Sequence, residues 1–154
     1  AAPAGCEPRR RRARQAWHWV DPETASAEIG RIVRPGGTLG LIWNARDNRV
    51  DWVRRFTAIM HASAAEEMLD AGGPTVAAPF GELETERWEW VRPMTRAQLH
   101  RMADSRSYLI TASEQERASI HEGMDALFDE LGVTGEDTID LPYVTTAFRA
   151  RRRD

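Results

Sequence analysis

A helix that leads through a glycine-containing stop into a short apolar run constrains this chain more than any other segment. Asp21 is a typical helix N-cap, and Pro22 suits the first helical position, where its missing N–H costs nothing. Apolar residues recur along one helical face: Ala25, Ile29, Ile32 and Val33. After the stop at Pro35-Gly36-Gly37, the run Leu39–Trp43 lacks alternation, which predicts a strand covered on both faces. This order predicts an α/β domain with a largely parallel sheet.

The remaining elements are predicted from caps and periodicity. Asp51 can cap a long helix reaching to about Asp70. Two capping boxes, Thr95 with Gln98 and Ser113 with Glu116, begin a short helix to about Ala103 and a longer one to Leu131. Between and after them we expect strands at Leu83–Val91 and Leu141–Ala150 and loops at Thr75–Gly81 and Ser105–Ala112.

Composition limits the class of protein. A chain of 154 residues allows one modest domain, and 42% hydrophobic with 29% charged residues is typical of a soluble globular protein. The net charge of −3 gives no general attraction to nucleic acid. The single cysteine, Cys6, excludes an internal disulfide framework. No apolar run approaches the length of a membrane span, and no signal-peptide pattern is present, so we expect no membrane partner and a cytoplasmic location.

The first 14 residues differ from the rest. Residues 1–14 carry five arginines against Glu7 and no apolar group larger than proline or cysteine. Such a segment cannot bury apolar area, so we predict a disordered basic N-terminal segment before a domain at 15–154. A basic tail that binds nucleic acid or an anionic membrane is a sharper alternative. A truncated gene or an out-of-frame start, in which arginine and proline replace an apolar strand, is a third.

The amino-acid sequences of two segments resemble those of a known family. Gln15–Pro22 reads QAWHWVDP, and Arg34–Asn44 reads RPGGTLGLIWN. Together with the helix between them, these segments are similar to the part of class I S-adenosylmethionine-dependent methyltransferases that follows the cofactor loop. The small-molecule type, which includes ubiquinone and menaquinone methyltransferases, is the most similar group. Weaker likenesses occur at RSYLITASEQERASI and DLPYVTTAFRAR.

The resemblance implies a partial fold. The family's sheet has strand order 3-2-1-4-5-7-6, with strand 7 antiparallel. Thr38–Trp43 would be strand 5, Leu83–Val91 strand 6 and Tyr143–Ala150 strand 7, with strand 4 at most a stub before Gln15. The implied fold is α/β, a partial Rossmann-like methyltransferase fold with flanking helices whose N-terminal half is missing. That half would hold the glycine-rich turn for S-adenosylmethionine.

The resemblance also implies site residues at the carboxyl ends of the strands, where ligands bind in open α/β sheets. Gln15, Trp17 and Trp19 would line the cofactor pocket, and His18 would be a polar contact or a base. Each has an ordinary structural alternative, such as a histidine packed between two indoles.

The substrate side is implied in the same way. Trp43 and Asn44 would end strand 5 on the substrate side, and Asn44 and Arg46 could bind a polar or anionic small-molecule acceptor. Tyr108 lies in a loop where relatives carry substrate contacts. A core tryptophan, an ordinary loop and a buried tyrosine are the structural alternatives. The histidines are too far apart in sequence to indicate a metal site.

Other functions stay open. Gly36-Gly37-x-x-Gly40 superficially matches a dinucleotide fingerprint, but the order is helix, glycines, strand, the reverse of what phosphate binding requires. A noncatalytic fragment that docks on itself or on a complementing chain through an exposed sheet edge is the main alternative to a methyltransferase. The edge at Thr38–Trp43 would be unprotected if its parallel neighbours were absent. We further expect weak cofactor binding by the isolated chain.

Overall fold

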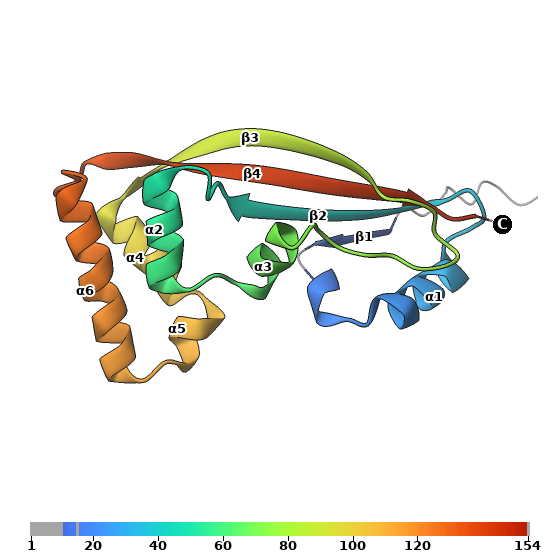
Figure 1. The fold of residues 1–154 in the computed structure, drawn as a ribbon, viewed down its shortest axis with the longest axis horizontal. Helices are drawn as coiled ribbons and strands as arrows, with labels where there is room; N and C mark the ends of the chain where they lie inside the picture. Colours follow the sequence, from blue (N-terminus) through green and yellow to red (C-terminus); the bar gives the residue numbers. More distant parts are fainter. Residues whose placement is uncertain (1–10, 15, 154) are drawn as a thin grey trace, which may run out of the picture. The chain divides into compact units, whose positions relative to one another are not determined.

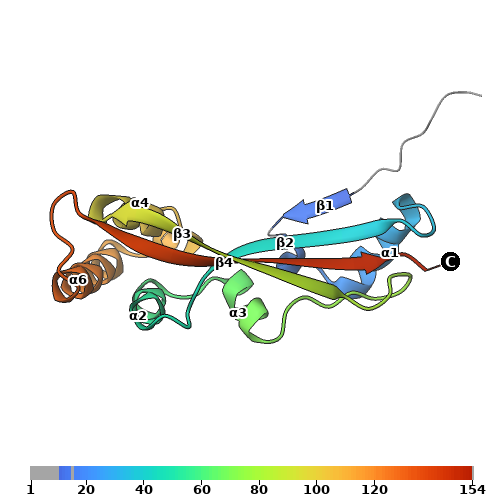
Figure 2. The ribbon, with the colours of Figure 1, turned by 90° about the horizontal axis from the view of Figure 1, so that it is seen from above.

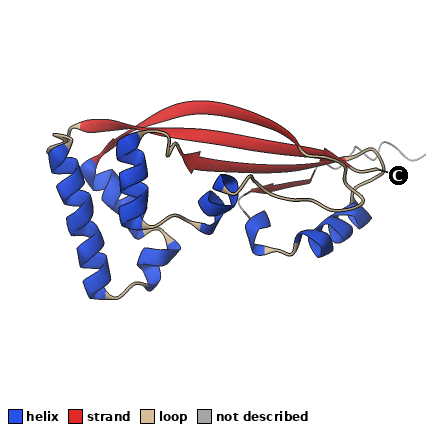
Figure 3. Ribbon diagram, viewed as in Figure 1, coloured by secondary structure: helices blue, strands red, loops and turns tan. Residues whose placement is uncertain are grey.

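The computed structural model describes residues 11–14 and 16–153 (Figure 1). The strands, shown red in Figure 3, are β1 (Arg11–Arg14), β2 (Thr38–Arg46), β3 (Glu84–Thr95) and β4 (Thr138–Arg151). The helices are a 3-10 turn η1 (Trp17–Trp19), α1 (Pro22–Ile32), α2 (Asp51–Met60), α3 (Ala64–Asp70), α4 (Arg96–Asp104), α5 (Ser107–Thr111) and α6 (Glu114–Glu130). None of the described helices has the length and apolarity that crossing a bilayer requires.

The four strands form one sheet in the order β1-β2-β4-β3. Backbone hydrogen bonds join Asp47 N to Pro142 O and Arg152 N to Gly37 O, so residue numbers rise along β2 as they fall along β4. An antiparallel bridge between Phe80 and Arg152 continues the same relation toward β3. The C-terminal strand is therefore antiparallel and lies between β2 and β3, as the resemblance predicted (Figure 2). The prediction of a largely parallel sheet is wrong for the described strands, because only β1 and β2 pair in parallel.

The N-terminal strand contradicts part of the predicted disorder. Arg11–Arg14 pair in parallel with β2, from Arg11 beside Leu39 to Arg14 beside Ile42. Residues 1–10 of the predicted segment lie outside the described residues. Composition misled here because strand pairing uses backbone N–H and C=O groups, which a polar segment supplies as well as an apolar one. The predicted open edge at Thr38–Trp43 is also wrong, because β2 has a neighbour on each side and β1 is the edge strand.

Contacts divide the chain into two compact units, and the long strands β2, β3 and β4 each contribute to both. The first unit comprises 1–44, 67–88 and 145–154. Its described core centres on β2, where Leu39, Leu41 and Trp43 are buried while the intervening Gly40 and Ile42 are partly exposed. The run Leu39–Trp43 was predicted to be covered on both faces; one face is buried, and the other is only partly covered. In α1, Val33 just beyond the last turn is buried, and Ile32 is 47% exposed.

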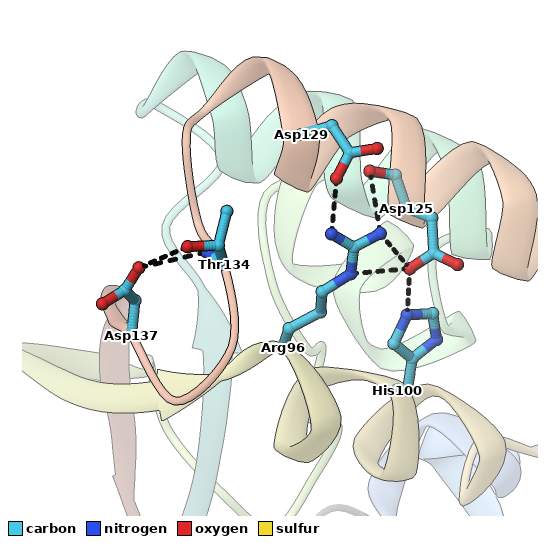
Figure 4. Close-up of polar contacts among 6 residues, drawn as sticks. All are labelled: Arg96, His100, Asp125, Asp129, Thr134 and Asp137. Carbon is cyan, nitrogen blue, oxygen red and sulfur yellow. Dashed lines mark hydrogen bonds and ion pairs between the residues drawn. The ribbon is translucent and has the colours of Figure 1, made fainter.

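The second unit comprises 45–66 and 89–144. Helices α2, α4 and α6 pack side by side in it (Figure 1). The predicted stripe of α6 faces this core through Ile120, Met124, Leu127 and Phe128. On the same helix, Asp125 and Asp129 bind Arg96 of α4, with Arg96 Nε 2.8 Å from Asp125 Oδ1 (Figure 4). His100 Nε2 lies 2.7 Å from the same Asp125 oxygen, so charged and apolar contacts join α4 to α6.

Three of the four predicted caps are present, but the predicted cap at Asp51 is wrong: Asp51 is the first residue of α2, and Val50 before it provides no side-chain cap. Asp21 accepts a hydrogen bond from Thr24 N, and both predicted capping boxes are present. The single long helix predicted for Asp51–Asp70 is wrong: α2 ends at Met60, where His61 takes a left-handed φ of 62°. A new helix, α3, then begins behind Ser63, whose Oγ accepts from Glu66 N at 3.3 Å. The apolar centre of the predicted loop at Ser105–Ala112 forms α5.

Candidate functional site

The parallel pair β1 and β2 creates the sheet edge at which the site residues were expected. Because Arg14 lies beside Ile42, the segment that follows β1 and the last residues of β2 leave the paired region at the same end. That end is the carboxyl end of both strands, where open α/β sheets bind ligands. Within the first unit it carries η1 and the pair Trp43-Asn44.

His18 has a ring nitrogen whose hydrogen-bonding capacity is unsatisfied within the described part of the chain. Its ring lies 4.8 Å from that of Trp19, and its Nδ1 atom is buried without a hydrogen-bond partner among the described residues. Burial lowers the pKa of His18 below its ordinary value of 6.5. The imidazole is therefore neutral at pH 7 and able to accept a proton. Trp19 beside it is 72% exposed, an unusual position for so large an apolar side chain.

Two tryptophans of the same edge are core residues. Trp17 is 4% exposed, and its indole N–H donates to Thr75 O at 2.8 Å. Trp43 is 1% exposed and meets Phe148 edge to face, with ring centroids 5.7 Å apart. The Trp43 Nε1 atom is buried without a partner in the described part of the chain. Gln15, which was predicted to line the cofactor pocket, lies outside the described residues.

Asn44 is exposed at the end of β2. Its Oδ1 accepts a hydrogen bond of 2.7 Å from Thr145 Oγ1 of β4. This bond fixes the amide, and the exposed position leaves the amide N–H₂ group available to a ligand.

Arg46 belongs to the second unit and is buried, with 3% of its surface exposed. Its Nη2 lies 2.7 Å from Glu66 Oε1, and its Nε donates to Thr57 Oγ1 at 3.0 Å. Ser63 N also donates to Glu66, at 2.9 Å, which holds the carboxylate in place. Loss of water lowers the pKa of Arg46, and the charge of Glu66 opposes that effect. Arg46 is thus a fixed, buried cation, whereas the sequence predicted a loop side chain.

Tyr108 lies on α5 of the second unit and is 43% exposed. Its ring centroid lies 4.1 Å from that of His61, the residue with the left-handed φ. The predicted site residues thus fall into two sets, His18, Trp19, Trp43 and Asn44 in one unit and Arg46 and Tyr108 in the other.

Sequence reasoning missed two polar residues of this second set. Glu66 was placed inside a continuous helix, although the Ser63-x-x-Glu66 spacing is a capping-box signal that could have revealed a new helix start. Arg106 was read as part of a loop, and its Nε atom is buried without a hydrogen-bond partner in the described ranges. No local pattern identifies Arg106, because only the folded chain brings it near other charges.

Comparison with known proteins identifies relatives. No protein-family model matches the chain. An uncharacterized methyltransferase of Mycobacterium tuberculosis is 37% identical over 137 residues, which are 88% of this chain and 55% of that protein. An uncharacterized methyltransferase-like protein of Schizosaccharomyces pombe is 29% identical over 149 residues, which are 90% of this chain and 56% of that protein. The chain therefore spans about half the length of the curated relatives it matches.

A solved structure has the same fold. It is a putative type II methyltransferase from Anaeromyxobacter dehalogenans, with a TM-score of 0.54 and 21% sequence identity, covering 91% of this chain and 63% of that one. At this identity the likeness concerns the fold, and the fold is the partial Rossmann-like α/β arrangement described above. Sequence identity to proteins named methyltransferases, together with this fold, leads to one conclusion: the chain belongs to the class I methyltransferase family.

Proposed function

We propose that the chain forms part of an enzyme that transfers a methyl group from S-adenosylmethionine to a small-molecule acceptor. The relatives' names support a methyltransferase. The observation that carries the proposal within this chain is the polar edge beyond the parallel pair β1 and β2, where the His18 Nδ1 atom is buried and unpartnered.

We further propose an equivalence of strands. The order β1-β2-β4-β3 with an antiparallel β4 corresponds to 4-5-7-6 at one side of the family's sheet. Under this equivalence β1 is the end of strand 4, and the segment after it faces the cofactor and acceptor. The glycine-rich turn of the family has no counterpart in the described residues, because each of their groups of closely spaced glycines follows a helix and precedes a strand: Gly36, Gly37 and Gly40; Gly72 and Gly73; Gly132 and Gly135.

The residues at this edge fit the proposed cofactor and acceptor in chemical type. S-adenosylmethionine supplies a methyl group that is already activated on a sulfonium. The chain's part is to align the acceptor and to take its proton. His18 is a neutral imidazole at pH 7 with a free Nδ1 atom, which suits a base. The exposed indole of Trp19 offers a flat apolar surface beside it, and Asn44 offers an amide.

The geometry revises two of the predicted roles. We propose Trp17 as a positioning residue instead of a cofactor contact, because its N–H is occupied by Thr75 O. It anchors the turn that presents His18 and Trp19. Trp43 similarly supports the edge from within the core, against Phe148.

A methyl-transfer assay tests the proposal. The chain is incubated with S-adenosylmethionine carrying a tritiated methyl group and with small acceptors bearing hydroxyl, amine or carboxylate groups. Because we expect the isolated chain to bind the cofactor weakly, the assay uses S-adenosylmethionine at about 1 mM or more. We expect slow transfer of label to at least one acceptor, and a loss of about 100-fold or more in His18→Gln, the range for removal of a general base. His121→Gln, a histidine on α6 paired with Asp104, is the matched control and should retain the rate. Transfer that is equal in His18→Gln and the parent would remove the base role.

A further inference from the structure

Two arginines of the second unit each keep a buried nitrogen without a hydrogen-bond partner. The atoms are Arg46 Nη1 and Arg106 Nε, and neither bonds to any described residue. A guanidinium N–H is a strong, permanently charged donor, so leaving one buried and unused costs free energy. Two such donors in one region indicate an acceptor that the protein chain does not itself provide.

Arg46 is held rigidly with one nitrogen to spare. Thr57 occupies its Nε and Glu66 its Nη2, at 3.0 Å and 2.9 Å. Asn48 Oδ1 accepts a hydrogen bond of 2.9 Å from the Thr57 hydroxyl, which orients that hydroxyl toward Arg46. The guanidinium group therefore has one orientation, and Nη1 is the donor left for a ligand.

Neighbouring elements bring Arg106 toward Arg46. The hydrogen bond from Asp47 N to Pro142 O places Arg46 of β2 opposite Tyr143 of β4. Opposed residues of an antiparallel pair share a face of the sheet. The hydroxyl of Tyr143 reaches Met102 Sδ at 3.4 Å. Met102 lies in the last turn of α4, and Arg106 follows in the short turn between α4 and α5.

The charges are consistent with this neighbourhood. The pKa of Arg46 is lowered first by burial, and the positive charge of Arg106 lowers it further. Arg46 and Arg106 repel each other, and Glu66 neutralises only one of them. The group carries a surplus of one positive charge, which a single negative charge would balance. Within the described residues, Arg106 forms no ion pair of its own.

Tyr143 adds a third donor. A thioether sulfur is a weak acceptor, so the Tyr143 hydroxyl gains by exchanging Met102 Sδ for a charged oxygen. The tyrosine ring is fixed, because it stacks on Trp90 with centroids 4.7 Å apart and 12° between the planes. Two guanidinium nitrogens and a phenol are a suitable set of donors for one carboxylate.

We propose that Arg46, Arg106 and Tyr143 form a binding site for a carboxylate, and that the methyl acceptor is a carboxylic acid held there by its anionic group. The identification of the ligand as the acceptor rests on the proposed function; the anion site itself does not. The surplus of one positive charge favours a carboxylate monoanion over a phosphate dianion, which would leave the site with excess negative charge.

Calorimetry with the 154-residue chain tests the site without the cofactor. The probes are benzoate, its neutral isostere benzamide, and inorganic phosphate. We expect benzoate to bind at least 10-fold more tightly than either of the others. Arg106→Gln should weaken benzoate binding about 10-fold to 100-fold, as the loss of a charged hydrogen bond does. Arg101→Gln, an exposed arginine on α4, is the control and should bind benzoate unchanged.

Tyr143→Phe keeps the ring and its stacking on Trp90 but removes the hydroxyl, and it should weaken benzoate binding about 5-fold. Equal binding of benzoate and benzamide, or unchanged binding in both Arg106→Gln and Tyr143→Phe, would overturn the site. Tighter binding of phosphate than of benzoate would overturn the choice of carboxylate. Benzoate binding with the expected variant losses, but without methyl transfer to any carboxylic acid, would leave the site standing and reject the methyl acceptor as its ligand.

Discussion

At the scale of single residues, burial gives side chains of the same type different roles. Arg31 and Glu28 form an ion pair on α1 with about two thirds of each side chain exposed. Arg46 and Glu66 form one with 1% and 6% exposed. In water an ion pair gains little, whereas inside the protein each charge depends on its partner. Nothing in the identity of the residues distinguishes the two pairs.

The first prediction compares these pairs. Glu66→Gln leaves Arg46 charged and buried without a counter-charge and should lower the free energy of unfolding by roughly 3–5 kcal/mol. Glu28→Gln should change it by at most about 1 kcal/mol. Urea unfolding followed by tryptophan fluorescence measures both. A cost for Glu66→Gln as small as that for Glu28→Gln would show that the buried pair contributes no more than the exposed one.

The second prediction concerns the pH dependence that His18 confers. Burial lowers its pKa below the value of 6.5 that applies to the unfolded chain. Between the lowered pKa of the folded protein and the value of 6.5, the unfolded state binds more protons than the native state. The contribution of His18 to the free energy of unfolding is therefore complete above about pH 6.5 and declines as the pH falls below it. His18→Gln should therefore lose less stability than the parent between pH 7.5 and pH 5. Urea unfolding at the two pH values measures the difference, and identical declines would contradict the assigned pKa direction.

At the scale of elements, local signals set helix starts, and tertiary contacts set helix ends. The caps at Asp21, Thr95 and Ser113 follow from side-chain groups that bond backbone N–H donors within three residues. The end of α2 at Met60 has no stop signal such as glycine or proline, and the local sign of a break is the Ser63-x-x-Glu66 capping box at the start of α3. A left-handed φ at His61 turns the chain there, and Glu66 then meets Arg46.

The third prediction tests a cap. Ser113→Ala removes the side-chain acceptor for Glu116 N and should destabilise the protein by about 1 kcal/mol. Ser119→Ala replaces an exposed serine inside the same helix and should stabilise it slightly, by roughly 0.5 kcal/mol at most. Thermal unfolding followed by circular dichroism distinguishes the two. A melting temperature of Ser113→Ala that is no lower than that of Ser119→Ala would mean that the cap is unimportant.

The fourth prediction tests a close approach in the first unit. A Cβ atom on Gly30 of α1 would lie 2.5 Å from Pro79 Cγ, on a ring that has no alternative rotamer to adopt. Gly30→Ala should therefore destabilise the protein by about 1–3 kcal/mol, although alanine favours helix by about 1 kcal/mol. Gly40→Ala in β2, where a Cβ meets nothing within 4 Å, is the control. Denaturant unfolding measures both variants, and a stabilising Gly30→Ala would show that the loop at Pro79 yields.

At the scale of the whole molecule, the sheet is built from backbone pairing that composition does not report. Four strands pair in the order β1-β2-β4-β3, although β1 consists of arginine and alanine and β3 is exposed over its first ten residues. Trp88 and Val91 of β3 are 53% and 56% exposed. Large apolar groups on an edge strand invite pairing with another chain.

The fifth prediction concerns the cofactor. Because the described residues contain no strand, glycine-rich turn and helix in that order, we expect S-adenosylhomocysteine to bind the chain more weakly than about 100 μM, a binding free energy less negative than roughly −5.5 kcal/mol. Isothermal titration calorimetry measures it, with adenosine as the comparison ligand. Low-micromolar binding would mean that His18, Trp19 and their neighbours hold the cofactor without the turn.

The sequence by itself determined the elements with local causes: the caps, the stripe of α6, the glycine stop before β2 and the family. It also predicted the antiparallel C-terminal strand, through the family's sheet order. Only the tertiary structure decided that Arg11–Arg14 pair as a strand, that the helix breaks at His61, and that Arg46, Glu66 and Arg106 share one environment. The physical reason is range. A cap is settled within one turn of chain, whereas strand pairing and the cost of burying a charge depend on groups tens of residues away.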